Sequence, residues 1–258
     1  MKGYIENEAN KLMKTAFKDI NDGHLINKIS ANSDLCKNSK ILSVCNWGTA
    51  KTTHFMKEMI KLSLEDNCCV HMIIYVSNNE NDLTFHRLKN FVTIPIIFVM
   101  NVDLNEIMDD LIKAKNMYFD SSNLKHQTHL ASQLKILWVS DIDHPLQTII
   151  FCDDAAHIFN SNNKQMIKHL ASLRHNRITF FICMQTWKMI APEVKSMLTL
   201  IYLGGGFNKR DLRYIYSQLP LQITFDEFEQ MYDELKNKFE KIKIDCIDNS
   251  LEIVNKDD

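Results

Sequence analysis

Apolar and polar residues follow one another along the chain in blocks that have the lengths of strands and helices. Short apolar runs bounded by polar or turn-forming residues predict strands at 41–45, 70–76, 94–100, 148–154, 178–185 and 198–206. Runs that lack polar alternation are typical of strands buried on both faces of a parallel sheet. The pattern therefore predicts a central, mostly parallel β-sheet.

Between these runs, apolar residues recur at helical spacing. This periodicity predicts helices over 51–66, 101–119 and 164–175. In the 187–194 segment, Pro192 is expected to interrupt the pattern. The tail predicts two short helices on either side of Pro220 and a final strand at 241–247. Strands that alternate with helices indicate an α/β fold, with helices flanking the sheet.

Composition places the chain among folded proteins and suggests one main domain. Its 258 residues are 45% hydrophobic and 24% charged, enough for one compact α/β domain. We expect an N-terminal helical lead-in over 1–37 and one domain over 38–258 that includes a small C-terminal appendage. No stretch has the length of a membrane span, and the seven scattered cysteines suggest a reduced, intracellular setting without a membrane.

The segment CNWGTAKTT, residues 45–53, lies between a predicted strand and a predicted helix, where a phosphate-binding loop belongs. Such a loop needs backbone N–H groups at a helix N-terminus, a lysine for the phosphates and a hydroxyl for Mg²⁺. We assign nucleotide binding to Asn46, Trp47, Gly48, Thr49, Ala50, Lys51, Thr52 and Thr53. Against the consensus GxxxxGK[ST], Cys45 and Ala50 replace the two glycines. The alternative is that Lys51 and Thr52 merely open a surface helix.

The apolar run TIIFCDD ends in two carboxylates, Asp153 and Asp154. Ligands of parallel α/β sheets bind at the ends of strands, so these acids are candidates for the chemistry. We assign Asp153, with Thr52, to Mg²⁺ and Asp154 to the attacking water. The alternative is that the two acids cap a following helix.

A third group of candidates surrounds the run 178–185. Gln185 ends this run, where its amide is placed to sense the γ-phosphate or the attacking water. Arg174 and Arg177 precede the run, and an arginine can stabilise charge on a transferring phosphate, often from a neighbouring subunit. Both arginines can equally be ordinary solvated residues between a helix and a strand.

Taken in order, CNWGTAKTT, the strand that ends in Asp-Asp, SLRHNRITFFICMQTW and the tail 207–235 resemble the genome-packaging ATPases of the FtsK–HerA branch. The resemblance spans residues 38–247 and implies a P-loop NTPase with a RecA/FtsK-like fold. It also implies ATP and Mg²⁺ as cofactors, with Lys51, Asp153, Asp154, Gln185 and Arg174 as the catalytic residues.

The same resemblance implies partners and a place of action. Members of this family form homo-oligomeric rings that push double-stranded DNA into capsids. We therefore expect a pentamer or hexamer, contact with capsid or portal proteins, and action inside an infected host cell. The formal net charge of -2 gives no bulk attraction for DNA, so contact with DNA requires a local basic patch.

Two other functions stay open from the sequence. One is a P-loop kinase or another nucleotide hydrolase that acts as a monomer on a small substrate, although no arginine-rich lid is evident. The other is a scaffold that binds nucleotide without turnover, because the side chains of Cys45 and Ala50 obstruct the close backbone approach that glycine permits.

Overall fold

The computed structural model describes residues 39–46, 51–64, 70–92, 94–120, 147–237 and 239–254. The predicted N-terminal lead-in over 1–37 lies outside these residues, as do positions 47–50 of the predicted loop.

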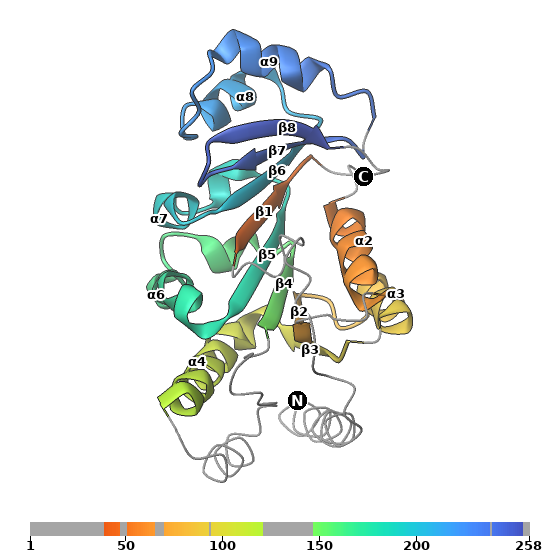
Figure 1. The fold of residues 1–258 in the computed structure, drawn as a ribbon, viewed down its shortest axis with the longest axis vertical. Coiled ribbons are helices and arrows are strands. Elements are labelled where there is room, and N and C mark those ends of the chain that lie inside the picture. Colours follow the sequence, from red (N-terminus) through yellow and green to blue (C-terminus); the bar gives the residue numbers. More distant parts are fainter. Residues whose placement is uncertain are drawn as a thin grey trace.

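The described residues form an eight-stranded sheet with the order β3-β2-β4-β5-β1-β6-β7-β8 (Figure 1). Its strands are β1 (Lys40–Val44), β2 (Val70–Ser77), β3 (Ile96–Met100), β4 (Gln147–Asp153), β5 (Ile178–Met184), β6 (Leu200–Gly204), β7 (Lys241–Asp245) and β8 (Ser250–Val254). The first six are mutually parallel, whereas β7 and β8 pair antiparallel. The predicted mostly parallel sheet is confirmed, and β8 is an addition that the sequence pattern did not predict.

Among the described residues, seven α-helices lie between the strands along the chain. They are α2 (Lys51–Leu64), α3 (Leu83–Phe91), α4 (Leu104–Asp120), α6 (Lys164–Ser172), α7 (Pro192–Ser196), α8 (Lys209–Tyr216) and α9 (Phe225–Asp233). The helix α3 was not predicted. It begins where the Asp82 side chain accepts a hydrogen bond from the Thr84 N–H. Pro192 starts α7, because the first residue of a helix needs no N–H partner.

The helices cover both faces of the sheet (Figure 1). One face packs under α2 and α3 through Phe55, Met59, Phe85 and Leu88. The other packs under α4, α6 and α7, and the tail helices α8 and α9 extend the same core. Strands buried on both faces explain the continuous apolar runs of the sequence. In the part of the chain that the structure describes, no helix is both long and apolar enough to cross a bilayer.

The tail folds as the two predicted helices and the predicted final strand, β7, to which the structure adds β8. Pro220 lies between α8 and α9. The second helix starts with a capping box, in which the Thr224 hydroxyl accepts from the Glu227 N–H and the Glu227 carboxylate accepts from the Thr224 N–H. Buried Leu212, Ile215 and Phe228 join the tail helices to the main core.

Aromatic packing fixes the first turn of α2 on the sheet. The Phe55 ring stacks on Phe151 of β4 with 3.7 Å between centroids and an interplanar angle of 7°. Residues four apart share one helix face, so the face that carries Phe55 also carries Lys51. The packing therefore holds the beginning of α2 above the carboxyl end of β4.

Candidate functional site

The candidate site lies at the sheet edge where the parallel strands end. Cys45 follows β1, Asp153 is the last residue of β4, and Gln185 follows β5. Because β5 lies between β1 and β4, the strand before the predicted loop and the acid-bearing strand are two strand spacings apart, about 10 Å. This leaves Gln185 between the two.

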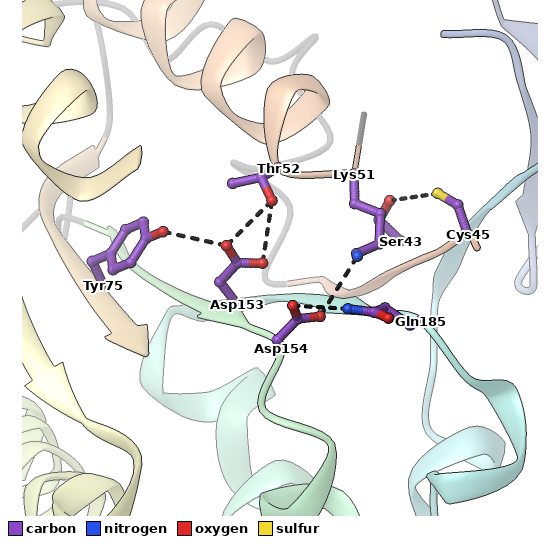
Figure 2. Close-up of polar contacts among 8 residues, drawn as sticks. All are labelled: Ser43, Cys45, Lys51, Thr52, Tyr75, Asp153, Asp154 and Gln185. Atoms are coloured by element: carbon purple, nitrogen blue, oxygen red, sulfur yellow. Dashed lines mark hydrogen bonds and ion pairs between the residues drawn. The ribbon is translucent and has the colours of Figure 1, made fainter. Parts of the chain in front are cut away.

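Lys51 and Thr52 both face the acids (Figure 2). Lys51 is the first residue of α2 and only 8% exposed, and its Nζ lies 3.5 Å from Asp154 Oδ1. The Thr52 hydroxyl lies 3.2 Å from each carboxylate oxygen of Asp153. The simple surface-helix alternative does not account for a buried lysine that faces a carboxylate.

The backbone turns sharply at Asp154, which adopts the left-handed region with φ 47°. Aspartate tolerates this conformation better than most residues. The Asp154 N–H still donates to the Cys183 carbonyl, so the turn comes directly at the strand end. Its carboxylate accepts from Gln185 Nε2 at 3.0 Å and faces Lys51 (Figure 2).

Burial raises the pKa of Asp153 to about 6, and the nearby charges of Asp154 and Asp82 add to this increase. Lys51 and the hydrogen bond from Thr52 act in the opposite direction. Adjacent carboxylates destabilise each other's ionised forms, which favours binding of a cation beside them.

The donor set fits Mg²⁺ bound together with a nucleotide. Mg²⁺ prefers oxygen ligands and is usually held by one or two protein oxygens, waters and phosphates. The Thr52 hydroxyl already contacts the Asp153 carboxylate, and a nearby positive charge would stabilise the ionised form of Asp153. These two residues are the ones that would hold the ion.

The Tyr75 hydroxyl also lies beside Asp153. The Tyr75 hydroxyl of β2 donates to Asp82 Oδ2 at 3.0 Å and lies 3.4 Å from Asp153 Oδ2. A cavity of about 470 Å³ opens here, between Asp153 and Asp154 on one side and the loop that ends in Asp82 on the other. Its volume is within the range of small-molecule sites.

The cysteine at the first glycine position packs against a glycine of the neighbouring strand. Cys45 is fully buried, and its Sγ lies 3.9 Å from the Ser43 hydroxyl. A Cβ added at Gly204 of β6 would meet Cβ and Sγ of Cys45 at 2.7 Å. The missing side chain at Gly204 therefore makes the space that the Cys45 side chain occupies.

The next residue of the loop is fixed by the same glycine run. Asn46 Nδ2 donates to the Gly206 carbonyl at 2.7 Å, and the Asn46 N–H donates to the Gly205 carbonyl at 3.4 Å. Gly206 has φ 97°, a conformation that other residues rarely adopt. The start of the loop is thus attached to the end of β6.

Thr53 and Arg174, the other predicted site residues that the structure describes, do not belong to the group around the acids. Thr53 is an exposed residue of α2, and the loop positions 47–50 lie outside the described residues. Arg174 belongs to a 3₁₀ turn that precedes β5, whereas Gln185 follows the same seven-residue strand. A strand of this length spans about 20 Å, so Arg174 lies at the opposite sheet edge from the acids of its own chain.

Sequence reasoning missed the Tyr75–Asp82 contact and the role of the glycine run. Gly204, Gly205 and Gly206 are three of only six glycines in the chain, which was a usable sign that the backbone approaches another segment there. Nothing in the spacing of Tyr75 and Asp153 connects them. Their proximity follows from the pairing of β2 with β4.

Comparison with solved structures gives the fold. The genome-packaging NTPase B204 of Sulfolobus turreted icosahedral virus 2, in complex with ATPγS, superposes with a TM-score of 0.56 at 13% identity, covering 84% of this chain and 97% of B204. B204 of Sulfolobus turreted icosahedral virus, described as the DNA-packaging ATPase, gives 0.55 at 12% identity with 84% and 97% covered.

A secretion ATPase has the same fold. EccC of Thermomonospora curvata, its ATPases 2 and 3 bound to a signal-sequence peptide, gives a TM-score of 0.54 at 12% identity, covering 86% of this chain and 37% of EccC. No protein-family model and no curated protein sequence matches the chain. The fold is thus that of P-loop NTPases, and it agrees with the resemblance to viral genome-packaging ATPases.

Proposed function

We propose that this chain hydrolyses ATP and couples hydrolysis to the movement of double-stranded DNA into a viral or virus-like capsid. The observation that carries the proposal is the meeting of Lys51 and Thr52 with Asp153 and Asp154 at one sheet edge. It is supported by the fold shared with B204, which was solved with ATPγS and with AMP.

The side chains have complementary tasks in this proposal. Lys51, at the N-terminus of α2, binds the β- and γ-phosphates together with the helix dipole. Thr52 and Asp153 would hold Mg²⁺, which supplies positive charge to neutralise the phosphates when it is bound. Asp154 accepts a proton from the attacking water while the water oxygen bonds to the γ-phosphorus and the bond to the bridging oxygen breaks. Gln185, which donates to Asp154, orients that water.

A ring explains the placement of Arg174. An arginine that precedes β5 is too far from the acids of its own chain, about 20 Å by strand length. In a homo-oligomeric ring, a pentamer or hexamer, Arg174 serves the site of a neighbouring subunit. Capsid or portal proteins are the further partners, and the place of action is the inside of an infected host cell.

Hydrolysis assays test the proposal directly. We expect ATP turnover that rises when double-stranded DNA is added and that weakens with increasing salt, because phosphate contacts depend on counterion release. Lys51→Ala and Asp153→Asn are each expected to lower turnover by about a hundredfold or more. Hydrolysis that is indifferent to DNA contradicts the translocation step, and no turnover above Lys51→Ala leaves the binding scaffold as the function.

Assembly separates the motor from a monomeric kinase. We expect the chain to form a ring in the presence of ATPγS or DNA, measured by size-exclusion chromatography with light scattering. A chain that stays monomeric under both conditions, while still transferring phosphate to a small acceptor, is not a ring motor.

A further inference from the structure

We propose that Tyr75 is a positioning residue, whose hydroxyl sets the orientation of Asp153 for binding Mg²⁺; this rests on the nucleotide site proposed above. Two hydroxyl groups approach the Asp153 carboxylate from different elements. Thr52 reaches both oxygens from α2, and Tyr75 approaches Oδ2 from β2 (Figure 2).

Ring packing fixes the Tyr75 hydroxyl in place. The ring of Tyr75 is fully buried and contacts Phe85 of α3 and Phe151 of β4, with centroids 5.5 and 5.0 Å away. A close-packed aromatic ring cannot shift its edge without disturbing its neighbours. The hydroxyl can therefore rotate its proton between acceptors but cannot leave the site.

Asp82 fixes the other side of the hydroxyl. Its Oδ2 accepts from Tyr75 at 3.0 Å, and its Oδ1 accepts from the Thr84 N–H at 2.8 Å as the N-cap of α3. The side chain of Asp82 is therefore held by two bonds and cannot turn away from Tyr75 unless α3 loses its cap. The hydroxyl stays between Asp82 and Asp153.

The hydroxyl also separates two like charges. Asp82 and Asp153 are both acceptors when ionised, and a phenolic O–H is a donor that either can use. The contact to Asp153 is longer than the one to Asp82, 3.4 against 3.0 Å. Asp82 is therefore the nearer acceptor for the hydroxyl proton. Tyr75→Phe would remove the hydroxyl that faces both carboxylates, leaving Asp82 with the Thr84 N–H and Asp153 with the Thr52 hydroxyl as donors.

The placement suits a role in holding the cation. The Thr52 hydroxyl is itself a proposed ligand, so its orientation follows the ion that it binds. Tyr75 is not a proposed ligand, and its position is set by the packing of its ring against Phe85 of α3 and Phe151 of β4. Loss of partners that orient a ligand commonly weakens metal affinity by about 10- to 100-fold.

Tyr75→Phe tests this role because it removes one oxygen and keeps the ring. Binding of a fluorescent ATP analogue is measured in EDTA and over a range of Mg²⁺ concentrations, which needs no turnover. We expect the affinity in EDTA to stay within about twofold of the wild type. The Mg²⁺ concentration for half-maximal tightening is expected to increase about tenfold.

Tyr216→Phe is the matched control. The Tyr216 hydroxyl donates to the Ile223 carbonyl at 2.6 Å in the tail, so its removal also deletes a hydrogen bond, but one remote from the acids. We expect this variant to lose some thermal stability and to keep the wild-type dependence on Mg²⁺. An unchanged Mg²⁺ dependence in Tyr75→Phe overturns the proposal.

A crystal structure of Tyr75→Phe gives a second answer that does not need nucleotide binding. We expect the Asp153 carboxylate to turn away from the position in which both oxygens contact Thr52. An Asp153 side chain that stays in place contradicts the positioning role. If the wild-type chain binds no nucleotide, the proposed function fails, and this structural comparison alone decides the role of Tyr75.

Discussion

Hydrogen bonds to the Asp153 carboxylate hold the β2–β4 side of the candidate site, the acid flank. On the β1–β6 side, the packed flank, Cys45 packs closely against Gly204, and Asn46 bonds to backbone carbonyls. On the first flank a substitution changes charge or a donor while leaving the shape intact. On the second it changes shape while leaving the charge intact. We therefore expect substitutions on the acid flank to change catalysis and pH dependence, and substitutions on the packed flank to change stability and the position of the loop.

The largest effect is expected at the strand end that carries the acids. Asp154→Asn keeps the size of the side chain and removes the group proposed to accept the proton, so single-turnover hydrolysis should decrease by about 10²- to 10⁴-fold. Nucleotide affinity should change much less, and in the direction of tighter binding, because Asp154 no longer competes with the phosphates for Lys51. The exposed Asp248→Asn, in the turn between β7 and β8, is the control, and wild-type hydrolysis in Asp154→Asn would remove Asp154 from the mechanism.

On the packed flank, Gly204→Ala should act through shape. The added Cβ meets Cys45 at 2.7 Å, and overpacking of this kind costs about 1–3 kcal/mol, which lowers the melting temperature by several degrees. Displacement of Cys45 should also weaken nucleotide binding, measured by titration calorimetry, by about tenfold.

Two further variants make this prediction specific. Gly205→Ala is the matched control, because a Cβ there meets nothing within 4 Å. Cys45→Gly in the Gly204→Ala background removes the atoms that collide and should restore binding. If Gly204→Ala and Gly205→Ala behave alike, the packing of Cys45 against Gly204 is not what positions the loop.

The contribution of the acid flank to nucleotide affinity should depend on pH, whereas that of the packed flank should not. The pKa of Asp153 is raised to about 6, and a metal ligand must lose its proton to bind. The Mg²⁺-dependent part of nucleotide affinity should therefore weaken about tenfold for each pH unit below about 6. Asp153→Asn has no such group, so its residual binding should not vary in this way, and a flat wild-type profile between pH 5 and 7 speaks against the assignment.

The smallest effect concerns stability and has the opposite sign from the effect on activity. Because Asp153 has a higher pKa in the folded protein than its usual 3.8, the folded state loses stability as pH increases through about 4 to 6. At neutral pH the ionised group therefore destabilises the nucleotide-free protein. Asp153→Asn should raise the melting temperature by a few degrees at pH 7, measured by calorimetry, with little difference near pH 4.

The sequence predicted the parts of the fold that depend on local pattern. The first six strands, the helix after the loop and the two tail helices follow from apolar runs, helical spacing and Pro220. The order of the strands did not follow, because an apolar run indicates burial but not which neighbour it pairs with. The placement of β5 between β1 and β4 is such a case.

The residues of the candidate site likewise include some that the sequence predicted and some that it did not. Lys51, Thr52, Asp153, Asp154 and Gln185 were found because each begins, ends or follows a recognisable element, and the structure brings these five together. Tyr75 and Gly204 were missed, since their contacts with Asp153 and Cys45 arise from strand pairing across more than 70 positions of sequence. Asp82 was missed because helix α3, which it caps, was not predicted. Arg174 lies apart from the group within one chain.

The ion pair between Lys51 and Asp154 has a consequence for the order of events at this sheet edge. While the lysine faces the carboxylate, its charge is already matched and the carboxylate is engaged. In the proposed mechanism, an incoming triphosphate would take the place of Asp154 beside the Lys51 ammonium, so the carboxylate would lose this ion pair as the phosphates bind. Nucleotide binding and release of the proposed proton acceptor from Lys51 would then be a single step of that mechanism.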